Sequence, residues 1–227
     1  MQPAHDTPMD LTPDIILRAY AAGVFPMAES RNDPDIFWVD PDMRGLLPLD
    51  QFHVPRSLKK IVRRGTFEIR YDTAFQSVIL ACAASSVGRD NTWINEKIVT
   101  LYSALHRMGH SHSVECWRNG CLVGGLYGLS LGGAFFGESM FSRESDASKV
   151  ALVYLVMRLR IGGYRLLDTQ FITDHLKQFG AIEISRQDYH GLLEEALTHT
   201  GIFYGDVSAD EEERVLKGLL QSTTQTS

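Results

Sequence analysis

The chain has 227 residues, 44% of them hydrophobic, and a formal net charge of −6 at pH 7. This length and composition predict a globular protein with a sizeable core, built as one large domain or two small ones. The net acidity argues against a general nucleic-acid coat protein. No apolar run reaches the roughly 18 residues that a membrane span needs, and the sequence shows no secretory signal, so we expect a cytoplasmic location.

The N-terminal segment predicts short elements. Thr12 and Pro13 supply a cap and a first-turn proline for a helix. Residues 36–39 read as a brief strand. Within that strand, Phe37 and Trp38 should point to opposite sides, so we expect one in the core and the other available to a partner.

The segment from residue 56 to residue 70 is distinctly basic, although the chain as a whole is acidic. Its predicted helix has an apolar stripe on one face and positive charges largely on the other. The cations of the segment are Arg56, Lys59, Lys60, Arg63, Arg64 and Arg70. Such a patch fits one phosphate-rich partner held at one place, and it fits an ordinary solvated helix face equally well.

A small polar segment at residues 84–92 predicts a domain boundary. We therefore expect a small N-terminal domain over residues 1–88 and a second domain over residues 89–205. Residues 206–227 begin with a cluster of acids and read as an acidic, polar C-terminal tail.

The second half predicts a sheet with helices packed on its faces. Residues 119–120, Asn-Gly, form the turn of the clearest hairpin, and a second hairpin turns at residues 131–133. A helix over residues 148–160 is apolar on every side, which is typical of a helix buried against a sheet. This order of elements favours the α+β class, with a mixed, largely antiparallel sheet flanked by helices.

The stretch of residues 123–149 places polar groups within an apolar wall. Glu138 and Ser139 follow two phenylalanines directly, and Met140 and Phe141 come next. Small-molecule pockets have this composition. The alternative is a core hairpin with Glu138 at its rim.

Asp168 and Gln170 lie two residues apart in a predicted strand, so both side chains project to one face. The carboxylate can orient the amide, and Glu138 is a second acid that can face the same space. Paired acids with an amide suit recognition of a cation or an amino group better than nucleophilic attack. The alternative is an ordinary strand end with hydrated polar groups.

Other motifs of catalysis or cofactor binding are weak or missing. The three cysteines lack paired spacing, and the histidines at 106, 110 and 112 diverge in direction and lack a fourth ligand, so we expect no metal site. No serine has the G-x-S-x-G context. The helix after Ser148 lacks the glycine-rich entry that cradles a pyrophosphate, which argues against coenzyme A and related cofactors. We expect no cofactor.

Several motifs, taken together and in order, closely resemble the bacterial leucyl/phenylalanyl-tRNA–protein transferases. The most distinctive is FGESMFS at residues 136–142, followed by LDTQ at residues 167–170. The other shared segments are residues 22–27, 40–41, 44–45, 92–94, 112–117, 123–128 and 147–149, together with Trp38. The resemblance runs from about residue 11 to about residue 189.

The resemblance implies a tRNA-contacting N-terminal domain and an acetyltransferase-like (GNAT) domain used without coenzyme A. It implies transfer of leucine or phenylalanine from Leu-tRNA or Phe-tRNA to the α-amino group of proteins that begin with Arg or Lys. The product enters the N-end rule degradation pathway. We expect a monomer without membrane association.

The same resemblance assigns site residues. Asp168, Gln170 and Glu138 carry the catalytic roles: Asp168 orients Gln170, Gln170 positions the attacking amine, and Glu138 helps to hold the substrate. The substrate-binding residues are Trp38, Trp93, Tyr102, Leu126, Phe135, Met140, Val150, Leu155, Leu159 and Leu167. The two tryptophans match aromatic residues near the terminal adenosine of the tRNA. Lys59, Lys60, Arg63 and Arg64 contact acceptor-stem phosphates.

Two rival readings predict different behaviour. A conventional acyl-CoA acetyltransferase should carry a glycine-rich loop before the helix that starts near Ser148, and the sequence has none there. A non-catalytic tRNA-binding module should keep its binding when Asp168 and Gln170 are replaced, with no chemistry to lose.

Overall fold

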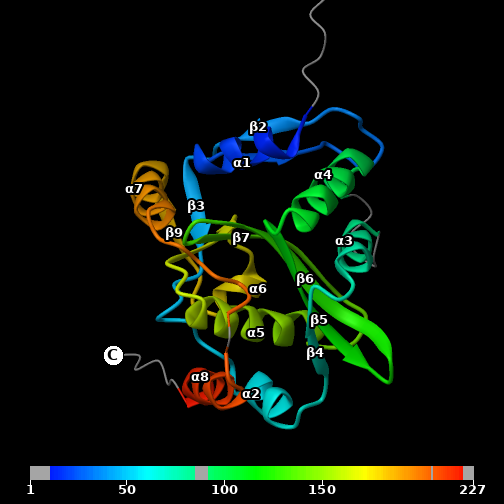
Figure 1. The fold of residues 1–227 in the computed structure, drawn as a ribbon, viewed down its shortest axis with the longest axis vertical. Helices are drawn as coiled ribbons and strands as arrows, with labels where there is room; N and C mark the ends of the chain where they lie inside the picture. Colours follow the sequence, from blue (N-terminus) through cyan, green and yellow to red (C-terminus); the bar gives the residue numbers. More distant parts are fainter. Residues whose placement is uncertain (1–10, 85–91, 206, 222–227) are drawn as a thin grey trace, which may run out of the picture.

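The computed structural model describes residues 11–84, 92–205 and 207–221, and Figure 1 shows their arrangement. The helices are α1 (Pro13–Ala21), α2 (Arg56–Arg63), α3 (Phe75–Ala83), α4 (Glu96–Arg107), α5 (Ala147–Ile161), α6 (Asp174–Lys177), α7 (Arg186–Leu197) and α8 (Ala209–Gln221). The strands are β1 (Phe25–Met27), β2 (Phe37–Val39), β3 (Met43–Leu46), β4 (Glu68–Tyr71), β5 (Ser111–Arg118), β6 (Cys121–Leu131), β7 (Ala134–Ser142), β8 (Leu166–Gln170) and β9 (Ile182–Ser185).

One large mixed sheet organises the fold. Its seven strands run in the order β4-β5-β6-β7-β8-β3-β9, and β1 pairs with β2 in a separate two-stranded sheet. Among the strands that the structure describes, only β7 and β8 pair in parallel, and α5 is the crossover helix that a parallel pair requires. The predicted α+β class, with a largely antiparallel sheet, is confirmed. The likeness to a GNAT domain stays a prediction.

Helices cover both faces of this sheet (Figure 1). On one face, α5 packs between the sheet and the helices α2 and α8, so it is buried on almost every side, as its sequence predicts. On the other face, α1, α3, α4 and α7 enclose a second apolar core. The two cores meet at the middle strands, where neighbouring residues such as Phe135 and Phe136 belong to opposite faces.

Both predicted hairpins are confirmed. Asn119 and Gly120 have positive φ angles of 52° and 75°, as a tight turn between β5 and β6 requires. The second hairpin joins β6 to β7 through Gly132 and Gly133. The cap at Thr12 also forms, because its hydroxyl accepts a hydrogen bond from the backbone nitrogen of Ile15 at 3.4 Å.

The expectation for Phe37 and Trp38 is wrong. The two residues remain 45% and 41% exposed, because β2 belongs to a small two-stranded sheet, and the described residues cover neither side chain fully. The sequence pattern predicts neither β3 nor β9. The predicted tail contains a helix, α8, whose Leu219 and Leu220 are buried in the core beside α5.

The predicted boundary at residues 84–92 falls almost wholly outside the described residues. The strands β3 and β4, from the segment before residue 88, pair with strands from the segment after it. The division into domains at that point stays a prediction. No helix in the described parts of the chain has the length and apolar character needed to cross a membrane.

Candidate active site

A cavity of about 540 Å³ opens where β7 and β8 stop pairing. Their parallel ladder runs only from Ala134 and Leu166 to Phe136 and Asp168. The residues that come directly after the paired segments of β7 and β8 line the cavity. The lining residues are Phe25, Met27, Trp93, Leu126, Tyr127, Gly137, Glu138, Ser139, Met140, Ser148, Leu152, Leu155, Leu167, Thr169, Gln170, Phe171, Thr173, His175 and Leu176.

Glu138 enters this cavity from an irregularity in β7. Gly137 pairs with Gly128 and Ser139 pairs with Tyr127, so Glu138 is an extra residue without a partner on β6. Such β-bulges redirect a side chain and often lie beside functional sites. The bulge therefore presents the carboxylate to the cavity rather than leaving it in the regular pleat.

Glu138 is half-buried as a residue, and tyrosine hydroxyls lie against its carboxylate. The Tyr20 hydroxyl donates a hydrogen bond to its Oε1 at 2.6 Å, and the hydroxyls of Tyr20 and Tyr102 are hydrogen-bonded to each other. Burial is the main cause that raises the pKa of Glu138 to about 8, and the negative charge of Asp168 adds to it. The hydrogen bond from Tyr20 and the charge of Arg44 oppose this rise.

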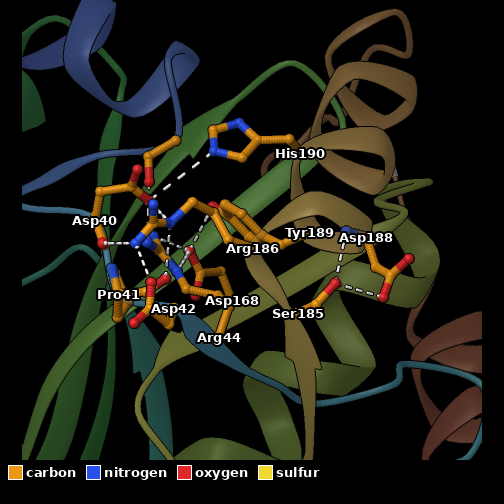
Figure 2. Close-up of polar contacts among 11 residues, drawn as sticks. Asp40, Pro41, Asp42, Arg44, Asp168, Ser185, Arg186, Asp188, Tyr189 and His190 are labelled. Atoms are coloured by element: carbon orange, nitrogen blue, oxygen red, sulfur yellow. Dashed lines mark hydrogen bonds and ion pairs between the residues drawn. The ribbon is translucent and has the colours of Figure 1, made fainter.

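Asp168 is fully buried and forms a salt bridge with Arg44 (Figure 2). The Arg44 Nη2 donates to Oδ2 at 2.6 Å, and its Nε lies 3.0 Å and 3.1 Å from the two carboxylate oxygens. The Tyr189 hydroxyl also donates to Oδ2, at 2.8 Å. The backbone nitrogen of Gln170 donates to Oδ1 at 2.7 Å. Both carboxylate oxygens of Asp168 therefore already accept hydrogen bonds from neighbouring groups of the protein.

Arg44 is only 1% exposed, so its charge depends on these partners. Its Nη1 donates to the Gly23 carbonyl at 2.9 Å, and its guanidinium lies 4.6 Å and 4.3 Å from the ring centres of Phe25 and Tyr189. Burial lowers the pKa of Arg44, but the hydrogen bonds and charge of Asp168 outweigh burial and raise it overall. Arg44 ties β3, the start of β1 and α7 to the Asp168 carboxylate.

Gln170 ends β8 in a left-handed conformation, with φ of 57°, which a residue with a side chain rarely adopts. The hydrogen bond from its backbone nitrogen to Asp168 holds it there. Its side chain is 7% exposed and lines the cavity, and its Nε2 has no hydrogen-bond partner among the described residues. A buried donor without a partner is costly, which favours a ligand that satisfies it.

The structure brings together part of the predicted substrate-binding set. Trp93, Leu126, Met140, Leu155 and Leu167 line the cavity beside Glu138 and Gln170. Phe135, Val150 and Leu159 lie instead in the core around α5, and Tyr102 lies below Glu138 through its contact with Tyr20. Trp38 lies on β2, whose partner strand β1 contributes Phe25 and Met27 to the cavity.

The predicted phosphate contacts lie on and just after α2, which packs against α5 and lies next to α8 (Figure 1). Lys60, Arg63 and Arg64 are exposed and Lys59 is half-buried. The Nη2 of Arg63 donates to the Leu220 carbonyl of α8 at 3.1 Å. The four cations thus share one end of the molecule.

Sequence reasoning missed Arg44, Tyr189 and Tyr20. Arg44 had one usable signal, because it lies just before the apolar residues 46–47, and a cation that is buried there needs a counter-charge. Tyr20 and Tyr189 sit in helices and show no local pattern that distinguishes them from core tyrosines.

The cavity is apolar along most of its wall and ends at the Glu138 carboxylate and the Gln170 amide, and this arrangement indicates a class of enzyme. It suits a transferase that buries an apolar acyl group and holds its carbonyl beside polar groups. Residues 46–194 match the family model described as leucyl/phenylalanyl-tRNA protein transferase, and residues 9–42 match the model of the N-terminal domain of the same family. The chain belongs to this family and is an aminoacyltransferase.

Similar proteins agree. The leucyl/phenylalanyl-tRNA–protein transferase of Paramagnetospirillum magneticum is 61% identical over 193 residues, which are 85% of this chain and 92% of that protein. The Maricaulis maris protein of the same name is 58% identical over 93% of this chain and 96% of its own length. That of Rhizorhabdus wittichii is 62% identical over 82% of this chain and 75% of its own length. The resemblance inferred from the sequence motifs is confirmed.

Proposed function

We propose that the protein moves leucine or phenylalanine from the 3′ end of Leu-tRNA or Phe-tRNA to the α-amino group of proteins that begin with Arg or Lys. The reaction forms a peptide bond and marks the product for N-end rule degradation. It takes place in the cytoplasm, and the enzyme acts as a monomer. The observation that carries the proposal is the apolar cavity that ends at Glu138 and Gln170.

The leucine or phenylalanine side chain occupies the apolar part of the cavity. Leu126, Met140, Leu155 and Leu167 supply its walls. Burying a side chain of this kind stabilises the complex by about 1.5–3 kcal/mol. The unbranched Met140 adapts to both a branched and a flat side chain, which supports the dual specificity.

The polar end of the cavity holds the reacting groups. Asp168 orients Gln170 through the Gln170 backbone nitrogen, and the Gln170 amide then positions the incoming amine against the ester carbonyl. A neutral amide is too weak a base to remove a proton, so its contribution is positioning. Glu138 helps to hold the substrate end.

The tRNA is held at two places. Trp93 at the cavity and Trp38 on the neighbouring β2 stack on the terminal adenosine, each contributing about 1–3 kcal/mol. Lys59, Lys60, Arg63 and Arg64 contact acceptor-stem phosphates, an interaction that weakens steeply with salt. Residues 1–88 then act as the tRNA-contacting domain, and residues 89–205 as a GNAT-like domain used without coenzyme A. The mixed sheet and its acyl-sized cavity support this assignment.

Transfer of radiolabelled leucine tests the proposal. Leu-tRNA carrying the label is incubated with the enzyme and a peptide that begins with Arg, beside the same peptide with an acetylated amino end. We expect label only on the free-amine peptide. Label on neither peptide, with the tRNA still bound, contradicts the proposal and leaves a non-catalytic tRNA-binding module.

A further inference from the structure

Two carboxylates lie close to the polar end of the cavity, and only one of them is open to a substrate. Asp168 is fully buried, is absent from the cavity wall, and accepts hydrogen bonds on both oxygens from Arg44, Tyr189 and Gln170. A carboxylate fixed in this way cannot receive a proton from a bound amine without breaking its salt bridge. Glu138 lines the cavity and is partly exposed to it.

We propose that Glu138 is the general base that accepts the proton of the attacking amine. The proposal rests on the proposed aminoacyl transfer and gives Glu138 a chemical role beyond holding the substrate. Glu138 is the one acid among the described residues that line the cavity. The bulge in β7 directs it there, and the Tyr20 hydroxyl at 2.6 Å fixes one carboxylate oxygen.

His175 is the other conventional base on the cavity wall, and it lies at the wrong end. The charges that influence it are Lys149 and Asp146, at the start of α5. The charges and hydroxyls that face Glu138 are Tyr20 of α1, Tyr102 of α4, Asp168 of β8 and Arg44 of β3. Glu138 therefore lies at the polar end of the cavity, next to Asp168 and the Gln170 that Asp168 holds. His175 lies elsewhere on the cavity wall, near the start of α5.

The proton that the amine loses passes through Glu138 to the leaving group. The neutral α-amine attacks the ester carbonyl, the carbon–nitrogen bond forms, and the carbonyl electron pair moves to oxygen. The nitrogen then transfers a proton to the Glu138 carboxylate. The carbonyl re-forms as the bond to the 3′ oxygen breaks, and that oxygen takes the proton from Glu138. The products are a peptide bond and a free 3′ hydroxyl, and Glu138 returns to its carboxylate form.

The chemistry of the site matches this role. A general base works best when its pKa lies near the operating pH, and burial raises the pKa of Glu138 to about 8. The nitrogen carries a positive charge once the carbon–nitrogen bond has formed, so the Glu138 carboxylate can take a proton from it and return that proton to the departing 3′ oxygen.

Single-turnover kinetics test the proposal with Glu138→Gln, which keeps the size of the side chain. Transfer from saturating Leu-tRNA to an Arg peptide is timed between about pH 6 and pH 8.5, and the Kd of Leu-tRNA is measured separately. We expect the saturated rate to fall by about 10²–10⁴-fold, with the Kd changed by less than about threefold. Glu144→Gln is the matched control, because Glu144 pairs with Arg118 outside the cavity.

The pH profile separates a base from a binding group. At low pH the wild-type rate should rise with a logarithmic slope of about two, because both the amine and Glu138 must be deprotonated. In Glu138→Gln the slope should fall to about one, whereas His175→Gln should keep a slope near two.

Three results overturn the inference while leaving the transfer reaction intact. The first is weaker binding of Leu-tRNA by Glu138→Gln with no change in the saturated rate. The second is a saturated rate in Glu138→Gln close to that of the wild type. The third is a pH–rate slope that falls in His175→Gln but not in Glu138→Gln. A wild-type enzyme that transfers no label is a different outcome, because it removes the proposed function itself and the inference with it.

Discussion

At the scale of single residues, the site depends on a buried cation that has no direct part in the chemistry. Arg44 neutralises Asp168, and Asp168 in turn holds the left-handed backbone of Gln170 through one hydrogen bond. The strain at Gln170 is thus maintained by a salt bridge one step away. This chain of contacts joins β3 to the end of β8.

Replacing Arg44 tests how much of the fold this contact supports. Arg44→Met leaves Asp168 buried without its counter-charge, so we expect the free energy of unfolding to fall by about 3–5 kcal/mol. Urea denaturation followed by circular dichroism measures the loss. Arg118→Met is the control, because Arg118 is half exposed and its partner Glu144 is only partly buried, so this pair should contribute less than about 1 kcal/mol. Equal losses in Arg44→Met and Arg118→Met contradict the assigned role of Arg44.

The salt bridge also explains why the sequence predicts some of the site and not all of it. Asp168, Gln170 and Glu138 stand out locally, because polar residues follow apolar strand residues. Arg44 lies 124 positions from Asp168, so no local pattern links them. The left-handed φ of Gln170 is likewise set by its surroundings, because glutamine by itself disfavours it.

At the scale of elements, turn chemistry and apolar pattern predict the long elements well. Residues 119–120 specify the β5–β6 hairpin by their preference for positive φ, and the apolar surface of α5 requires burial all round. The four-residue strands β3 and β9 carry no such signal. They are strands because β3 pairs with both β8 and β9, and those pairings depend on the assembled sheet.

The helix α2 offers a test at this scale. If its cations contact tRNA phosphates, the Lys60→Gln/Arg64→Gln variant should bind Leu-tRNA more weakly at low salt. The slope of log K against log salt should also shrink by about 0.7–0.9 for each phosphate that the variant leaves without a cation. Filter binding over a salt series measures the slope. Lys217→Gln on α8 is the control, because Lys217 pairs with Glu213 and should leave the slope unchanged. An unchanged slope in the double variant assigns α2 to an ordinary solvated surface.

At the scale of the whole molecule, the fold joins two apolar cores through a sheet whose central pair of strands separates. The cavity lies at this separation, so its walls come from both cores: Leu155 and Leu167 from one, and Tyr127 from the other. Placing a carboxylate at the junction costs stability, because Glu138 loses water when the two cores close around it.

That cost is predicted to depend on pH. The pKa of Glu138 rises from an ordinary value of 4.5 to about 8 in the folded protein, chiefly through burial. Between these pH values the folded state keeps a proton that the unfolded state has released, so the free energy of unfolding falls as the pH rises through this range. Below it, both states are protonated and the cost disappears.

Glu138→Gln should therefore be more stable than the wild type, even though it loses activity. The gain in the free energy of unfolding should be small near pH 5 and largest above about pH 8, where the wild-type carboxylate is charged in both states. Urea denaturation at the two pH values measures it, with Glu144→Gln as a control that shows no such difference. A gain that is equal at both pH values would place the Glu138 carboxylate in contact with water, because a solvated group keeps its ordinary pKa and adds no pH-dependent stability term.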